Sequence, residues 1–250
     1  MYGKSGDVNY ARLVFDRMLC RNVWTWSSMI LGFAQHGYAK RALELFTEMS
    51  NYSVKPNHVT FLGVLCACSH AGLVEDGKCY FHEMENMHGI EPKMVHFGAM
   101  VDVLGRADLL KEAYKFITRM PIEADTVVWR TLLSACNIHD INDYSGVGEK
   151  VRKMLIELEP KMSGNIVMVA NNYAEAGLWQ EAEYLRNRMR DRGLKKMAGE
   201  SCLEVGGSNY RFFSGDFSFI ACEEIFLLLT RLNLHVKMIN LREYSLIIEF

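Results

Sequence analysis

Residues 42–49 read Ala42-Leu43-Glu44-Leu45-Phe46-Thr47-Glu48-Met49, and variants of this segment recur along the chain. Each good copy opens on alanine or glycine and ends on methionine. The other copies begin at Ala11, Gly77, Ala113, Gly148 (the weakest) and Ala182. The six starts are 31, 35, 36, 35 and 34 residues apart. A constant period of this size is typical of an array of small structural repeats.

Each repeat is predicted to be two helices joined by a tight turn. Turn dipeptides such as His36-Gly37 and Ala71-Gly72 stand before most copies, and an apolar helical stretch such as 28–34 precedes them. The small first residue suits close approach of the paired helix, and the Phe and Met positions share one helix face. We expect these residues to form core rather than a ligand site.

One such repeat cannot bury its apolar face alone, so neighbouring repeats are expected to stack. The predicted fold is therefore all-α, a right-handed superhelical solenoid of helix-turn-helix repeats. Such an array has a concave and a convex surface, and function is expected on the concave one.

Composition limits the classes of partner. The net charge is -2 over 250 residues, so a nucleic-acid contact must come from a local surface. Seven cysteines without framework spacing favour a reducing compartment. No run approaches the roughly 18 apolar residues of a membrane span, and no membrane partner is expected. Residues 1–6 match neither a signal nor a transit peptide, and the first repeat starts incomplete.

Two segments separate the possible repeat families. Residues 21–30, Arg-Asn-Val-Trp-Thr-Trp-Ser-Ser-Met-Ile, and residues 54–61, Val-Lys-Pro-Asn-His-Val-Thr-Phe, resemble the start and the end of a pentatricopeptide repeat. Residues 65–74, 100–107, 128–136 and 192–196 are similar to the plant subclass with alternating P, L and S repeats. The resemblance runs over roughly residues 1 to 227.

The resemblance implies a division of the chain into repeats. In order, these are 1–22, the end of an S repeat; 23–57, a P repeat; 58–93, an L repeat; 94–125, an S repeat; 126–197, an E region of two tetratricopeptide-like units; 198–217, an E+ segment; and 218–250, a divergent tail. Three features depart from the family pattern: 139–148 is about three residues longer, Cys202 replaces the usual tryptophan, and the pattern ends near Leu228.

The resemblance also implies how single-stranded RNA would be read, with one base held per repeat. The second position of each repeat clamps the base, here Trp24, Val59 and Val95. The fifth and last positions read it, here Ser27 with Asn57, a pair that favours adenine in this family. A purely structural alternative makes Asn57 a helix N-cap and Ser27 a solvated residue of the first turn.

The remaining reading positions are weaker. Leu62 with Lys93 cannot form a specific pair, and beside Gly98 the last residue, Asp125, acts alone. Asn22 closes a repeat whose fifth position lies upstream of this chain. Lys55 and Lys93 are candidates for phosphate contacts.

No catalytic centre is expected. In the family, C-to-U editing is performed by a zinc deaminase domain that needs His-x-Glu and Cys-x-x-Cys, and neither occurs here. Cys66-Ala67-Cys68 has the wrong spacing for a metal site, and Gly146-Val147-Gly148 lacks a dinucleotide-binding context. We expect no metal and no cofactor.

The resemblance implies a recognition module of a mitochondrion, or alternatively a chloroplast. Its partners would be single-stranded organellar RNA and, through 126–217, a deaminase-bearing pentatricopeptide-repeat protein and editing accessory factors. Two alternatives stay open. The first is a protein-interaction scaffold with vestigial RNA repeats, and the second is a splicing or transcript-stability factor.

Overall fold

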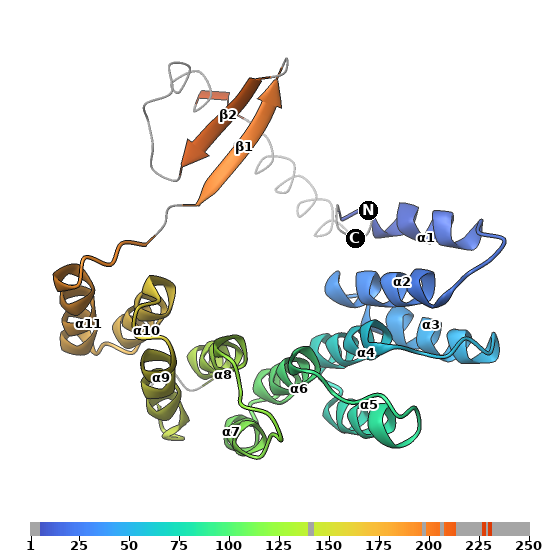
Figure 1. Ribbon diagram of the computed structural model, residues 1–250, viewed down its shortest axis with the longest axis horizontal. Coiled ribbons are helices and arrows are strands. Elements are labelled where there is room, and N and C mark those ends of the chain that lie inside the picture. The colour runs from blue at the N-terminus through green and yellow to red at the C-terminus, as the bar shows by residue number, and fades with distance from the viewer. Residues whose placement is uncertain are drawn as a thin grey trace, which may run out of the picture. The chain divides into compact units, whose positions relative to one another are not determined.

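The computed structural model describes residues 6–139, 143–196, 199–205, 208–213, 227–228 and 230–231. The chain divides into two compact units, Met1–Lys195 and Lys196–Phe250. In the described residues the first unit contains helices only and the second contains one β-hairpin (Figure 1).

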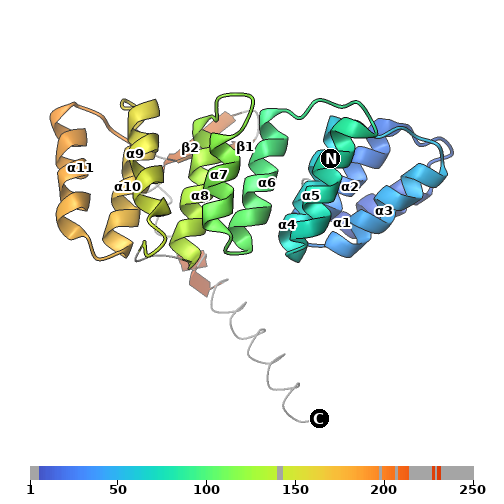
Figure 2. The ribbon, with the colours of Figure 1, turned by 90° about the horizontal axis from the view of Figure 1, so that it is seen from below.

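The first unit is a row of helix pairs that follows one leading helix, α1 (Val8–Asp16). The pairs are α2 (Val23–Gln35) with α3 (Ala39–Asn51), α4 (His58–Ala71) with α5 (Val74–Asn86), α6 (Met94–Arg106) with α7 (Leu110–Thr118), α8 (Thr126–His139) with α9 (Val147–Leu158), and α10 (Ser163–Glu175) with α11 (Trp179–Asp191). Figure 1 shows α4, α6, α8 and α10 along the inner side of a shallow arc, and Figure 2 shows the helices side by side. The predicted solenoid of paired helices is confirmed.

Three of the first helices, α2, α4 and α8, begin at polar side-chain N-caps. The Oδ1 atoms of Asn22 and Asn57 accept hydrogen bonds from the backbone N–H of Thr25 and Thr60, at 3.1 and 3.0 Å. Asp125 caps α8 in the same way through Val128, at 3.0 Å. These bonds satisfy amides that the first helical turn leaves without a partner.

The turns inside the pairs use left-handed backbone, as the glycine dipeptides predict. Gly37, Gly72 and Gly177 have φ values of 79°, 68° and 76°. The turn between α6 and α7 places Asp108 there, at φ 61°. Glycine adopts this conformation without a steric cost, whereas a residue with a Cβ does not.

Small residues let neighbouring first helices approach closely. A Cβ at Gly63 of α4 would lie 2.9 Å from the backbone N of Leu31 in α2. A Cβ at Gly105 of α6 would lie 2.7 Å from the Cβ of Ala135 in α8. The first helices therefore pack backbone against backbone at Gly63 and backbone against the alanine Cβ at Gly105.

The core is a series of apolar clusters along the array rather than one centre. The predicted stripe supplies much of it, including Ala42, Phe46, Met49 and Met84, which are buried. Met18 is an exception and is exposed. None of the helices in the described part of the chain is long and apolar enough to cross a membrane.

The second unit contains β1 (Glu200–Val205) and β2 (Ser208–Phe213), paired antiparallel with Glu200 opposite Phe213 and Val205 opposite Ser208. The all-α prediction did not include this hairpin. Its second strand carries Tyr210, Phe212 and Phe213, and aromatic residues favour strands. The hairpin lies inside the range 198–217, while almost all of 218–250 lies outside the described residues.

Candidate nucleic-acid interface

A row of apolar side chains stands in solvent at the beginning of the first helices. Trp24, Val95 and Val127 are 64%, 54% and 59% exposed, and Val59 is half-buried. Each is the second residue of its helix. Because α2 contacts α4, α4 contacts α6 and α6 contacts α8, the row follows the N-terminal ends of four neighbouring helices.

Val127 was not among the clamp residues predicted from the sequence. It stands two residues after the N-cap Asp125, just as Val59 stands two residues after the N-cap Asn57. That constant offset was the available signal. It was missed because residues from 126 onward were assigned to a different kind of repeat.

A groove of about 500 Å³ borders the first members of this row. Helix α1 supplies one wall, with Val14 and Met18 among its residues. Asn22, Trp24 and Val59 also line the groove. The structure therefore brings two predicted clamp residues and one predicted reading residue to the same depression.

The capping bonds determine which polar atom each last-position residue leaves for a ligand. A backbone N–H only donates, so the atom of Asn57 that faces Thr60 N must be the oxygen Oδ1. The amide nitrogen Nδ2 then remains as a hydrogen-bond donor. For Asp125, whose Oδ1 caps α8, the second carboxylate oxygen remains and is an acceptor.

Ser27 and Asn57 are in contact, as their predicted pairing requires. The Ser27 Oγ lies 3.1 Å from Asn57 Oδ1, 2.7 Å from Thr60 Oγ1 and 2.7 Å from the carbonyl oxygen of Val23. However, Ser27 is 0% exposed, so its hydroxyl lies beneath Asn57 rather than at the surface. Of the structural alternative, the N-cap role of Asn57 is confirmed, and the solvated position of Ser27 is wrong.

In the next repeat a histidine replaces the capping amide. His96 is buried, its Nδ1 accepts from the backbone N–H of Lys93 at 3.0 Å, and its Nε2 donates to the carbonyl oxygen of His58 at 2.8 Å. Burial lowers the pKa of His96, which keeps the ring neutral at pH 7. Leu62 is half-buried and Lys93 is exposed, and an apolar side chain cannot hydrogen-bond to the ammonium group.

At the third pair of predicted reading positions, Gly98 and Asp125, no atom crowds the glycine. A Cβ added at Gly98 would meet only Val128 Cγ2, at 3.7 Å, which is an ordinary contact. Asp125 is exposed. Its free carboxylate oxygen is therefore accessible to a ligand.

The Cys66–Cys68 pair has the character of core. Burial raises the pKa of the Cys66 thiol to about 11 and that of Cys68 to about 12. Thiols with such pKa values stay protonated at pH 7, whereas metal ligation requires the thiolate. Among the described residues there is no group of three potential metal ligands.

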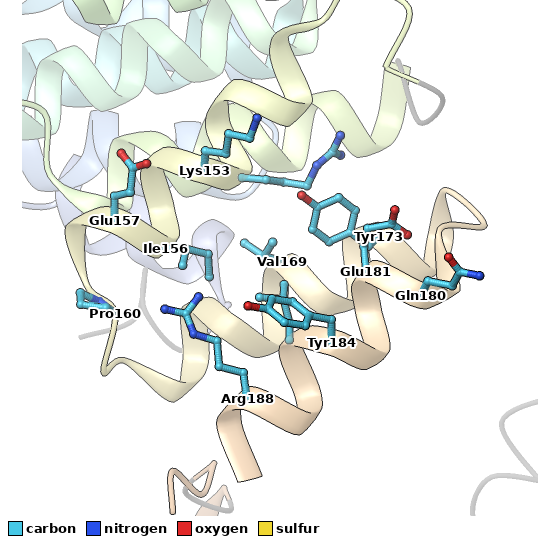
Figure 3. A pocket seen from close by; sticks show the side chains of 12 residues that line it. Lys153, Ile156, Glu157, Pro160, Val169, Tyr173, Gln180, Glu181, Tyr184 and Arg188 are labelled. Carbon is cyan, nitrogen blue, oxygen red and sulfur yellow. The ribbon is translucent and has the colours of Figure 1, made fainter. Parts of the chain in front are cut away.

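A second cavity, of about 600 Å³, lies between α9, α10 and α11, and the sequence did not predict it. Figure 3 shows Tyr184 and Arg188 of α11 pointing toward Ile156 of α9. Beside it, buried Arg152 contacts Asp143 at 2.9 Å and Glu149 at 3.2 Å.

The charges around Arg152 form a closed network. Tyr173 donates to Glu149 at 3.0 Å, and burial together with this bond raises the pKa of Tyr173 to about 12. Arg152 also donates to Asn172. The buried charge is thus paired and hydrogen-bonded, and its role is to join α9 to α10.

Family models match most of the helical unit. The PPR repeat family matches residues 21–70, the PPR repeat matches 1–23, 59–88 and 95–122, and the E motif matches 144–204. Asn57, Thr60 and the clamp residues Trp24, Val59 and Val95 all fall within the repeat matches.

Several Arabidopsis thaliana proteins named as pentatricopeptide repeat-containing are similar to this chain. One is 43% identical over 237 residues, which is 95% of this chain and 44% of that protein. A chloroplastic one is 43% identical over 95% of this chain and 28% of its own length. A mitochondrial one is 44% identical over 87% of this chain and 34% of its own length. The chain spans less than half the length of these relatives.

Solved structures agree on the fold. The maize pentatricopeptide repeat protein PPR10 matches with a TM-score of 0.60 at 22% identity, over 79% of this chain and 29% of that one. PPR10 in complex with an 18-nt psaJ RNA element matches with a TM-score of 0.55 at 20% identity, over 79% of this chain and 33% of that one. From its repeats, its E motif and these relatives, the chain belongs to the pentatricopeptide-repeat family, and it fits the PLS subclass.

Proposed function

We propose that this chain binds single-stranded RNA along the row Trp24, Val59, Val95 and Val127, with one base between successive members. The observation that carries the proposal is the exposure of Trp24, Val95 and Val127, which with the half-buried Val59 each stand two residues after an N-cap. Apolar side chains can sandwich a base of any sequence, and polar groups beside them can then distinguish its edge.

Asn57 is the main reader in this proposal. Its free Nδ2 donates, so it matches a base that presents an unprotonated ring nitrogen on its Watson–Crick edge. Adenine and cytosine do so, whereas guanine and uracil present a ring N–H there. The preference for adenine in the repeat 23–57 is therefore supported by the direction of the capping bond.

The test is Asn57→Asp, measured by fluorescence anisotropy on RNAs that differ at one position. Aspartate retains an oxygen for the N-cap but turns the free donor into an acceptor. We expect preference to move from adenine and cytosine toward guanine and uracil at that position. One good base contact corresponds to about 1–3 kcal/mol of discrimination.

A matched control is Asn86→Asp, the same change in charge on the second helix α5, where Asn86 is exposed. It should leave the base preference as it is. If Asn57→Asp shifts affinity for all RNAs equally, the change acts through charge alone and base reading by Asn57 is contradicted.

The second part of the proposal concerns the pathway. The match to an E motif and the organellar names of the relatives support a non-enzymatic role in organellar C-to-U editing. In this role the repeats find the transcript in a mitochondrion or chloroplast, and residues 126–217 recruit a deaminase-bearing pentatricopeptide-repeat protein. The groove between α9, α10 and α11 offers mixed apolar and charged groups for that contact.

Co-precipitation with a purified deaminase-bearing protein of this family tests the recruitment. Tyr184→Ala with Arg188→Glu should weaken the complex if this groove is the contact. Tyr38→Ala with Arg41→Glu, an exposed tyrosine–arginine pair at the start of α3 rather than on α11, should not. An undiminished complex in the groove variant would contradict this contact.

A protein-interaction scaffold is the second candidate function, and the net charge of -2 favours it. This function predicts that the complex with the deaminase-bearing protein forms, while the chain prefers no base at any position of the RNA. The anisotropy experiment distinguishes it from RNA reading.

A further inference from the structure

We propose that the C-terminal end of α11 is a second RNA-contacting surface, which binds the phosphate backbone beyond the apolar row and does so whatever the base. This surface, the basic end of α11, consists of Arg186, Arg188, Arg190, Arg192 and Lys195. The inference rests on the proposed RNA binding. It adds a contact that does not depend on sequence.

The basic end differs in charge from the rest of the chain. Residues 186–195 carry a net charge of +4, from five cations and Asp191. The ten residues that precede the next first helix in the four earlier repeats carry 0 or -1, and these are 48–57, 84–93, 116–125 and 153–162. Because the whole chain carries -2, the 240 residues outside 186–195 together carry -6. A polyanion is therefore attracted to this end and repelled by the remaining net charge.

The cations of the basic end are available to a ligand. All are exposed except Arg188, which is half-buried. None of them forms an ion pair with any residue that the structure describes. Arg186 alone makes a side-chain hydrogen bond there, to Asn171 Oδ1 at 3.1 Å. Their charges are thus neither neutralised nor used to join helices, in contrast to that of the buried Arg152.

Stabilisation of the helix end is the alternative explanation of these charges. Cations near a helix C-terminus interact favourably with the helix macrodipole. However, α3, α5 and α9 have no basic residue in the last turn, and α7 has one, Lys115. Arg192 and Lys195 moreover come after Asp191, the last residue of α11. Helix stabilisation therefore does not account for five cations here.

The basic end lies at the edge of the array that the apolar row follows. Asn137 near the end of α8 donates to Glu175 at the end of α10 at 2.9 Å, so both first helices end at one edge and begin at the other. After the tight turn at Gly177, α11 packs antiparallel against α10 and ends beside its start (Figure 2). Val127 stands at the start of α8, at this same edge.

The apolar row does not continue to α10. Its second residue is Gly164, where α8 has Val127. A Cβ added at Gly164 would meet no atom within 4 Å, so the place is open. An RNA strand that passes α10 meets no apolar side chain there to sandwich a base. Contact beyond Val127 therefore falls to charges that attract phosphates, and such contacts carry no sequence information.

The first experiment measures the salt dependence of RNA binding by fluorescence anisotropy. The triple variant Arg190→Gln, Arg192→Gln, Lys195→Gln removes three charges and leaves Arg188 in the groove between α9, α10 and α11. Each phosphate contact on a single strand contributes about 0.7 to the slope of log affinity against log salt concentration, so the slope should become shallower by about 2. An unchanged slope would overturn the inference.

The matched control removes three charges at the opposite edge, with Lys40→Gln, Arg41→Gln and Lys111→Gln. These exposed side chains lie within the first three residues of α3 and α7. The control measures the effect of net charge alone and should leave the slope as in the wild type, because distant exposed charges are screened. Arg190→Lys with Arg192→Lys retains the charges and should retain the slope as well.

A second experiment extends a bound RNA by about ten uridines or ten adenosines, at one end or at the other. Extension at one end should tighten binding to the wild type by about the same factor for both bases. The triple variant should lose this gain. If neither extension tightens binding to the wild type, the RNA does not reach the basic end, and the inference is overturned. A gain for one base only would indicate base reading instead and would overturn it too.

These results are separate from the base preference that tests the proposed function. Base preference together with an unchanged slope in the triple variant would contradict the basic end alone. A shallower slope in a chain that prefers no base would support the basic end and contradict base reading. If the triple variant loses the deaminase-bearing protein while its slope is unchanged, the cations contact an acidic protein surface, and the inference is overturned.

Discussion

At the scale of single residues, this chain reverses the usual locations of polar and apolar groups along one edge. Ser27, Thr60 and His96 are buried, whereas Trp24 and Val95 stand in solvent. Large apolar groups in a row on a surface mark a binding site more often than a packing defect. The buried polar groups are hydrogen-bonded, so they position neighbouring atoms.

His96 predicts a pH dependence of stability. Burial lowers its pKa in the folded chain below the ordinary value of 6.5. The unfolded chain therefore takes up the proton first as pH falls, and the free energy of unfolding should decrease below pH 6.5. The slope is at most about 1.4 kcal/mol per pH unit for this one group. Burial lowers the pKa of His58 too, which acts in the same direction.

Urea denaturation at pH 7.5 and pH 5.5 measures this effect. In His96→Gln the difference in unfolding free energy between the two pH values should shrink. His82→Gln on the exposed side of α5 controls for the removal of a histidine. Equal pH dependence in wild type and His96→Gln would show that His96 is not responsible.

At the scale of elements, the turns show where local sequence and backbone conformation agree or conflict. Gly37 and Gly72 occupy left-handed positions that glycine adopts freely. Asp108 occupies the corresponding position between α6 and α7, and it is exposed. The sequence pattern predicted the turn there but not its conformational cost.

Asp108→Gly should therefore stabilise the chain. Removing the strain of the left-handed conformation at Asp108 gains more free energy than the added conformational entropy of glycine in the unfolded chain costs. We expect the free energy of unfolding to rise by roughly 0.5–1 kcal/mol. Gly37→Asp, the reverse change at the matching turn, should destabilise by a similar amount. Thermal denaturation of both variants measures the effect, and a lower melting temperature for Asp108→Gly would contradict it.

At the scale of the whole molecule, stability depends on contacts between neighbours, because each repeat touches only the adjacent ones. Gly63 lets α4 approach the backbone of α2. Gly98 of α6 makes no comparable approach, because a Cβ added there would lie 3.7 Å from Val128 Cγ2, an ordinary contact. The two glycines therefore have different roles in the array.

Alanine substitutions should have opposite signs at these positions. Gly63→Ala should destabilise by about 1–3 kcal/mol, because its Cβ would overlap backbone atoms that cannot move aside independently. Gly98→Ala should stabilise by roughly 0.5–1 kcal/mol, because alanine is the better helix former. Hydrogen exchange should show that the amides that lose protection in Gly63→Ala lie mainly in α1–α3. Equal effects of the two changes would contradict the close approach of α2 and α4.

The repeat period, the helix pairs, the glycine turns and the Asn57 cap could all be predicted from the sequence, because spacing and helix propensity act over a few neighbouring residues. The burial of Ser27 beneath Asn57, the contact of Ser27 with Thr60 and the cavity lined by Arg152 could not. They depend on contacts between helices more than 15 residues apart in the chain, and the distance between those helices is set by packing at residues such as Gly63. Stacking thereby brings the local cap at Asn57 into contact with a side chain of the neighbouring helix.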